Sequence, residues 1–192
     1  MINIKKSILA SIETNLKIVS DQEFLLELKR IANYMIACLR SKKKILIAGN
    51  GGSASDAQHF AAELAGQFVH KRKGLPVLAL TTNSSITTAI GNDFGYEYVF
   101  SRQVEGLGHQ GDIFVGISTS GNSLNLVHAM NAAKENGLIT VGLLGRDGGQ
   151  MGNLCDLRLI VPSQSTQHIQ EAHIVIIHEL CSLIDEAFKH HV

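Results

Sequence analysis

The chain of 192 residues has no tryptophan, only two prolines and no net charge, because seventeen Lys and Arg residues balance seventeen Asp and Glu residues. A balanced charge provides no overall field that would attract DNA, RNA or an anionic membrane surface. We therefore expect neither a nucleic-acid partner nor membrane binding. The most basic stretch, residues 71–73, is too short for a nucleic-acid-binding stripe, and we interpret it as solvated loop charge.

Cysteine is also scarce, and no long hydrophobic run is present. Three cysteines, Cys38, Cys155 and Cys181, are odd in number and widely spaced, which is typical of free thiols in a reducing compartment rather than of a disulfide framework. No apolar run of signal-peptide length follows the N-terminus, and His178 and Asp185 interrupt the apolar stretch near the C-terminus. These features predict a cytoplasmic protein.

Short, continuous apolar runs follow residue 44 and alternate with segments of helical periodicity. Such runs are typical of strands buried on both faces, and their alternation with helices indicates a parallel α/β sheet. The expected strands are 45–48, 77–80, 113–117, 140–144 and 157–161. The expected helices between them are 55–64, 84–90, 99–107, 123–135 and 169–188. We predict one domain over 1–192, with two N-terminal helices in 1–40 and a doubly wound, three-layer α/β core with a five-stranded parallel sheet in 44–192.

Two loops rich in glycine and hydroxyl groups follow the first and third expected strands. The first runs from Gly49 to Ser55 and the second from Ser118 to Ser123, and each leads directly into a helix. Ligands of α/β sheets bind beyond the carboxyl ends of the strands, and backbone N–H groups at a helix N-terminus favour an anion. We interpret both loops as phosphate-binding loops, the second being the better cradle. The alternative is that Ser53 and Ser123 only cap their helices.

The first loop also matches a dinucleotide-binding pattern. Gly49, Gly51 and Ala54 fit the spacing G-x-G-x-x-G/A. That fold requires an acidic residue at the end of the second strand, but here Leu80 is followed by residues 81–84, Thr-Thr-Asn-Ser, which include no carboxylate. The sequence therefore predicts no nucleotide cofactor.

Candidate acid–base residues lie on the helix after the first loop and on the last helix. His59 and Glu63 are four residues apart, so they share one helical face. Gln170 and His178 are eight residues apart, which separates them by about 12 Å along a straight helix. A carboxylate and a histidine near bound phosphate can move protons between adjacent carbons of a sugar. The alternatives for His59 and Glu63 are an exposed pair without a ligand or half of a metal site.

Four segments together resemble the bacterial phosphoheptose isomerases, which are sugar-isomerase (SIS) domain proteins. These segments are GNGGSASDAQHFAAE at 49–63, AIGNDFG at 89–95, GISTSGNS at 116–123, and IQEAH at 169–173 followed by His178. The resemblance covers nearly the whole chain. It implies conversion of D-sedoheptulose 7-phosphate to D-glycero-D-manno-heptose 7-phosphate for lipopolysaccharide or capsule heptoses, by a cytoplasmic homotetramer.

The resemblance also assigns roles to the matching positions. Glu63 would remove a proton from the carbon next to the carbonyl, and His178 would be the partner acid. The hydroxyl groups of 118–123 would hold the phosphate. The implied substrate-binding residues are Asn50, Gly51, Gly52, Ser53, Glu63, Asn92, Asp93, Ser118, Thr119, Ser120, Ser123 and Gln170. Several members carry zinc through positions that match His59, Glu63, Gln170 and His178.

Part of this assignment conflicts with helix geometry and with the family pattern. On a straight helix Gln170 and His178 cannot easily share one metal ion, so the helix begins irregularly or a neighbouring subunit contributes. A bound cation would also lower the pKa of Glu63 and make it a poorer base. Family members usually have arginine at the positions of Gln67 and His168, which leaves the exact heptose phosphate open.

Two other functions compete with the enzyme. A paralogous group of SIS proteins associates with the bacterial replication initiator, and a chain with Ser in place of Glu63 and Asn in place of His178 would fit that group. A sugar-phosphate sensor would need a DNA-binding or partner domain, for which 192 residues leave no room. Because both acid–base residues are present, the sequence favours the enzyme.

Overall fold

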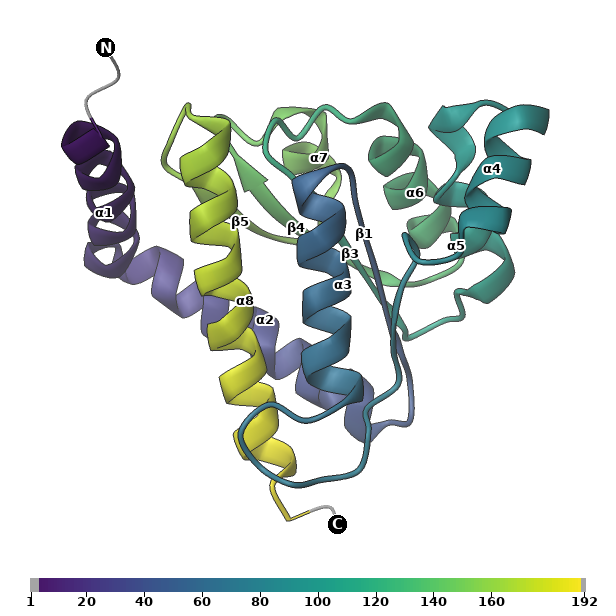
Figure 1. The fold of residues 1–192 in the computed structure, drawn as a ribbon. Helices are drawn as coiled ribbons and strands as arrows, with labels where there is room; N and C mark the ends of the chain where they lie inside the picture. Colours follow the sequence, from purple (N-terminus) through teal and green to yellow (C-terminus); the bar gives the residue numbers. More distant parts are fainter. Residues whose placement is uncertain (1–3, 191–192) are drawn as a thin grey trace.

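A single parallel sheet forms the middle layer of the computed structural model, which describes residues 4–190 (Figure 1). Its strand order is β2-β1-β3-β4-β5. The strands are β1 (Ile45–Gly49), β2 (Val77–Ala79), β3 (Ile113–Ser118), β4 (Ile139–Gly145) and β5 (Leu157–Val161). The predicted doubly wound α/β fold is therefore confirmed, and each predicted strand end agrees with the structure to within one residue.

Helices cover both faces of the sheet. One face carries α2 (Gln22–Arg40), α3 (Gly52–Ala65) and α8 (Thr166–Phe188), with α1 (Ile4–Ser20) beyond them at the edge of the molecule (Figure 1). The other side carries α4 (Ser84–Asp93), the short 3₁₀ helix η1 (Tyr96–Tyr98), α5 (Ser101–Leu107), α6 (Leu124–Glu135) and α7 (Gly149–Leu154). The sequence did not predict η1 or α7, because such short segments show no helical period.

Two hydrophobic cores lie on opposite sides of the sheet. Successive side chains of a strand point to opposite faces, so Ile45 and Ile47 pack under α2, α3 and α8 while Leu46 packs under α6. The three cysteines are free and buried. Burial raises the pKa of Cys181 to about 12, so its thiol stays protonated near neutral pH.

An exposed stripe of apolar side chains runs along one side of α1. Ile8, Ile12, Leu16 and Val19 are all at least 45% exposed, and residues of α1, α2 and α8 line a groove of about 530 Å³ beside them. A stripe of this kind marks an interaction surface rather than an ordinary solvent face. None of the helices within residues 4–190 is sufficiently long and apolar to cross a membrane.

A buried ion pair fastens the loop after α3 to the C-terminal half of α8. Asp185 is 1% exposed; it accepts hydrogen bonds from Arg72 Nε at 2.8 Å and from the backbone N–H and the ring Nδ1 of His70, each at 2.9 Å. Arg72 also donates to the backbone carbonyls of Glu63 and Leu64 at the end of α3. The interpretation of residues 71–73 as solvated charge is therefore wrong for Arg72, because the loop folds back over α8 and encloses its guanidinium.

Candidate active site

A cavity of about 300 Å³ lies at the carboxyl ends of β1 and β3, between the two loops predicted to bind phosphate. Its walls contain most of the predicted substrate-binding residues. The lining residues are Asn50, Gly51, Gly52, Ser53, Ile117, Ser118, Thr119, Ser123, Thr166 and Gln170. Helices α3 and α6 both begin beside this cavity, so their positive N-terminal ends favour an anion there.

Glycines shape the first loop. Gly51 has φ +57°, a left-handed conformation that lets the chain turn sharply from β1 into α3. At Gly52 a Cβ atom would lie 2.5 Å from Gln170 Nε2, so a larger residue there would push this side-chain amide away from the start of α3. The loop thus brings the end of β1 and the start of α8 to the same cavity.

The amide of Asn50 is held in one orientation at the cavity wall. Its Nδ2 donates to Asn125 Oδ1 and its Oδ1 accepts from Asn125 Nδ2, both at 2.9 Å. The hydroxyl of Tyr96 also donates to Asn50 Oδ1, at 3.2 Å. Sequence reasoning missed Asn125, Tyr96 and the cavity residue Thr166, because no local pattern separates them from ordinary surface residues. The only available signal for Thr166 was its place just after the fifth strand.

A second cluster, formed by His59, Glu63 and His178, lies farther along α3 and α8. His59 Nε2 is 3.2 Å from Glu63 Oε1 and 3.1 Å from His178 Nε2. The ring of Phe68 lies over His178 with a centroid separation of 6.0 Å. The structure therefore brings both predicted acid–base residues, Glu63 and His178, to one place within a single chain.

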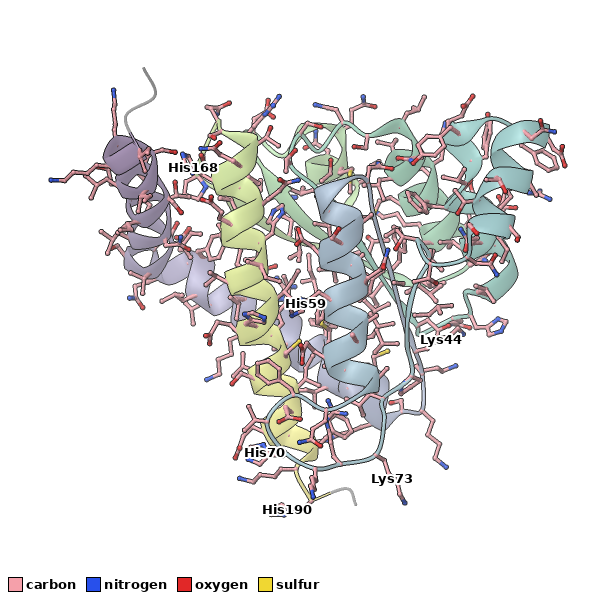
Figure 2. All side chains as sticks on the ribbon, in the orientation of Figure 1. Lys44, His59, His70, Lys73, His168 and His190 are labelled. Atoms are coloured by element: carbon pink, nitrogen blue, oxygen red, sulfur yellow. The ribbon has the colours of Figure 1, made fainter. Side chains whose placement is uncertain are left out.

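The parallel course of α3 and α8 explains this pairing. Both helices begin at the same edge of the sheet and run side by side, with His59 placed between them (Figures 1 and 2). Gly52 of α3 meets Gln170 of α8 near the start of each helix. Seven residues after Gly52 comes His59, and eight residues after Gln170 comes His178. Similar steps along two neighbouring helices therefore bring the two imidazoles together.

The cavity and the acid–base cluster are separate within one chain. At 1.5 Å per residue, His59 lies about 10 Å and Glu63 about 16 Å along α3 from Gly52. The sequence analysis placed Glu63 close to the phosphate loops, and the structure instead places it near the far end of the helix. One chain alone thus does not place Glu63 beside a ligand held in the cavity.

Besides Glu63, three predicted substrate-binding residues do not line the cavity in the described part of the chain. Asn92 and Asp93 are exposed at the end of α4, where Asn92 Nδ2 donates to Asp93 Oδ1 at 2.8 Å. Ser120 lies in the second loop, and its Oγ accepts the Asn122 N–H at 3.2 Å. Their assignment stays a prediction.

The donor atoms for zinc are present, but one chain does not complete a zinc site. Imidazole nitrogen and carboxylate oxygen are ordinary zinc ligands, and His59, Glu63 and His178 supply them. Within residues 4–190, however, no three His, Cys, Asp or Glu side chains are arranged to hold a metal ion together. Gln170 lies at the phosphate cavity, and α8 is helical from Thr166 onward, so an irregular start of this helix does not bring Gln170 to His178.

The remaining histidine of the resembling segment has a structural role. His173 is fully buried and its Nε2 lies 3.0 Å from the carbonyl oxygen of Leu144, to which it donates. Burial lowers the pKa of His173 to about 4, so the ring is neutral near pH 7. It anchors α8 to β4.

The comparisons with known proteins agree with this architecture. The family model of the SIS domain matches residues 9–145. The curated phosphoheptose isomerase of Aneurinibacillus thermoaerophilus is 52% identical over 96% of this chain and 93% of that protein, and the one of Sulfurimonas denitrificans is 50% identical over 95% and 94%. The solved phosphoheptose isomerase of Neisseria gonorrhoeae has a TM-score of 0.90 at 44% identity and covers 95% of this chain and 97% of that one.

The fold and the loops at the ends of β1 and β3, together with the family match, define the class as that of SIS-domain proteins. The identity to curated relatives extends over nearly the full length of both chains, including the helices that carry Glu63 and His178. The chain therefore belongs to the phosphoheptose isomerase family.

Proposed function

We propose that this protein is a cytoplasmic aldose–ketose isomerase that converts D-sedoheptulose 7-phosphate to D-glycero-D-manno-heptose 7-phosphate, for the heptoses of lipopolysaccharide or capsule. The observation that carries the proposal is the cluster in which His59 lies within 3.2 Å of both Glu63 and His178. Its acid and base are those that the reaction requires. The nearby anion cavity and the family membership support a sugar phosphate as the substrate.

The reaction moves one proton between adjacent carbons. Glu63 takes the proton from C1 of the ketose, the C2 carbonyl oxygen receives a proton from His178, and an enediol forms. The enediol then returns the proton of its C1 hydroxyl to His178 and receives at C2 the proton held by Glu63, which leaves an aldehyde at C1 and restores both groups. His59 contacts both groups and orients them, while the cavity hydroxyls hold the phosphate at the other end of the substrate.

A turnover assay with D-sedoheptulose 7-phosphate, followed by NMR of the product, tests the proposal directly. We expect the aldose phosphate to accumulate to equilibrium in a metal-replete buffer. Binding of the sugar phosphate without conversion would contradict the enzyme and favour the sensor or the initiator-binding protein.

We further propose that the active site is completed between subunits of a homotetramer. The reacting carbons of the substrate are C1 and C2, at the end of the sugar away from the phosphate. The backbone of Glu63 lies about 16 Å along α3 from Gly52 at the cavity of its own chain, and this rise exceeds the length of an extended heptose chain. A closed symmetric assembly would bury the exposed stripe of α1 and bring the cluster of one subunit to the cavity of another.

Subunit mixing provides the test of this arrangement. Glu63→Gln inactivates the cluster, whereas Thr119→Asp places a carboxylate where the phosphate binds. After dissociation and reassociation, random mixed tetramers of these two variants should regain activity in roughly a quarter of their sites, because such sites receive an intact cluster and an intact cavity from different chains.

The matched control is a mixture of Glu63→Gln with His178→Asn, which should stay inactive because both residues belong to one cluster of one chain. Recovery in this control but not in the first mixture would refute the proposed division of the site. A fully active monomer at assay dilution would also refute it.

We also propose a zinc ion at the cluster. His59, Glu63 and His178 of one subunit, which are not arranged as a metal site in the described chain by itself, would draw together around the ion with Gln170 of a neighbouring subunit. The donor set supports it, because two imidazoles and a carboxylate suit a borderline cation. When bound, zinc would polarise the oxygens of the sugar. Elemental analysis of protein purified without chelator should find about one zinc per chain in the wild type and a marked loss in His59→Ala. Metal-free wild-type protein with full activity would contradict the proposal.

A further inference from the structure

The turn after β4 packs directly against the phosphate loop of residues 118–123. A Cβ atom at Gly145 would lie 2.8 Å from the carbonyl oxygen of Thr119, and a Cβ at Gly121 would overlap the carbonyl of Gly148. The N–H of Met151 donates to the carbonyl of Gly121 at 2.9 Å. Residues 145–151 therefore pack against the phosphate loop and support it from behind.

Arg146, the residue after Gly145, has an unusual backbone. Its φ is +57°, and within residues 4–190 only Lys42 shares a positive φ among the residues other than glycine. Lys42 follows α2 at the opposite edge of the sheet, just before β1. A non-glycine residue in this conformation is strained, and strained residues cluster at functional sites, although the strain by itself does not distinguish Arg146 from Lys42.

The side chain of Arg146 reaches the wall of the cavity. Its Nη2 lies 3.5 Å from Oγ1 of Thr166, a residue that lines the phosphate cavity. On its other side Arg146 borders a separate cavity of about 350 Å³, whose other charged or titratable residues are Glu13, Lys17 and His168. Arg146 is exposed and forms no ion pair with any residue that the structure describes. Its positive charge is therefore not paired with a carboxylate of residues 4–190.

The cavity itself lacks the charge that Arg146 carries. None of the lining residues in the described range 4–190 is lysine or arginine, so hydroxyl groups, backbone N–H groups and helix ends are the only favourable partners for an anion. A sugar phosphate near pH 7 carries up to two negative charges. The guanidinium of Arg146 contacts the hydroxyl of Thr166 in the cavity wall. From this position it would stabilise the dianion and form charge-assisted hydrogen bonds with it.

We propose that Arg146 is a specificity-determining residue that supplies the counter-charge for the phosphate dianion of the substrate. This role rests on the proposed function, because it places the phosphate in the cavity of residues 50–53 and 118–123. It predicts that Arg146 favours the dianionic phosphate over uncharged sugars and contributes to substrate binding rather than to proton transfer.

Three substitutions separate charge from backbone strain. Arg146→Gln removes the charge, Arg146→Lys keeps it, and Arg146→Gly removes the side chain while relieving the left-handed strain. Calorimetric titration with inorganic phosphate should show about tenfold weaker binding for Arg146→Gln and Arg146→Gly, and less than about threefold weakening for Arg146→Lys. The matched control is Lys42→Gln, because Lys42 is also a cation with a left-handed backbone but lies away from the cavity. This variant should bind phosphate like the wild type. Thr119→Ala, a loss of a lining hydroxyl, should weaken binding in the same assay and serves as the positive control.

Kinetics with D-sedoheptulose 7-phosphate complete the test. We expect Arg146→Gln to raise KM by about tenfold with kcat within about twofold, because the interaction is with the phosphate and not with the reacting carbons. Equal phosphate affinity of the wild type and Arg146→Gln, or a glycine variant that binds phosphate normally, would refute the role even if turnover is normal. Because phosphate binding is measured without turnover, a wild type that failed to isomerise would instead contradict the proposed function.

Discussion

Replacing Glu63 with Gln, or His178 with Asn, should each lower kcat for D-sedoheptulose 7-phosphate by at least ~100-fold, because positioned acids and bases typically contribute factors of 10² to 10⁴. Glu63→Gln keeps the size of the side chain, His178→Asn keeps a polar but smaller side chain, and both remove the ability to exchange the proton. The two groups lie within 3.2 Å of the same His59 nitrogen, so each variant should disable the same cluster. Steady-state kinetics should show the loss mainly in kcat.

The control for these variants is Glu135→Gln. Glu135 is an exposed carboxylate at the end of α6, on the other side of the sheet from the cluster, and its replacement should leave kcat unchanged. Circular dichroism should show the same helical content in all three variants. Near-wild-type kcat in both Glu63→Gln and His178→Asn would contradict the proposed acid–base roles.

Asp185→Ala should lower the free energy of unfolding by about 3–5 kcal/mol, because removal of one partner leaves the other charge of a buried pair uncompensated. The side chain of Arg72 is fully buried, and Asp185 is its only ion-pair partner among the described residues. The substitution also removes the acceptor for the backbone N–H groups of Val69 and His70. Urea unfolding of the wild type and the variant measures the difference.

The loop supplies a matched control in Lys71→Ala, which removes an exposed charge one residue from Arg72. We expect a change within about 0.5 kcal/mol for this variant. A loss below about 1 kcal/mol for Asp185→Ala would contradict the importance of the buried pair.

The effect of Asp185 should depend on pH. Burial acts to raise the pKa of Asp185, but hydrogen bonds from His70 and Arg72 outweigh it and hold the pKa below the ordinary value of 3.8. A carboxyl group with a lowered pKa stabilises the folded state above its unfolded pKa and loses this contribution as the pH falls through its folded pKa. The stability difference between wild type and Asp185→Ala should therefore be constant near neutral pH and shrink below about pH 4.

The strands were predictable because each is a short, mostly apolar run. The three central strands β1, β3 and β4 are buried almost throughout, whereas Leu78 of β2 and Arg158 of β5 are exposed at the two edges of the sheet. β1 and β3 are buried at every residue, so no exposed position interrupts their hydrophobic pattern and the first and last residues of each strand can be read from the sequence to within one residue. The phosphate loops were predictable for a similar reason, since each is a single local segment between a strand and a helix. The sequence did not predict α7 and η1, because segments of six and three residues are too short to show a helical period of hydrophobic residues.

Contacts between distant segments account for what the sequence did not reveal. The sequence neighbours of Arg72 are those of an ordinary solvated basic loop. Its ion-pair partner Asp185 is 113 residues away in the chain, so no local pattern indicates the pair. The Asn50–Asn125 amide pair joins residues 75 apart, and nothing in the sequence around Asn125 marks it as the partner of Asn50. The distance between Glu63 and the cavity likewise depends on how α3 sits along α8, which no spacing within α3 alone can specify.

Because α3 and α8 run side by side, two helical segments of similar length set the distance between the cavity and the acid–base cluster. Segments 52–59 and 170–178 start at one contact, between Gly52 and Gln170, and end at another, between His59 and His178. One residue inserted into either segment would rotate everything beyond it by about 100° and shift it by about 1.5 Å, which would carry one imidazole away from the other. The length of these segments is therefore constrained more tightly than the identity of their solvent-facing residues. An altered length in one helix would need a matching change in the other to keep the acid–base cluster together.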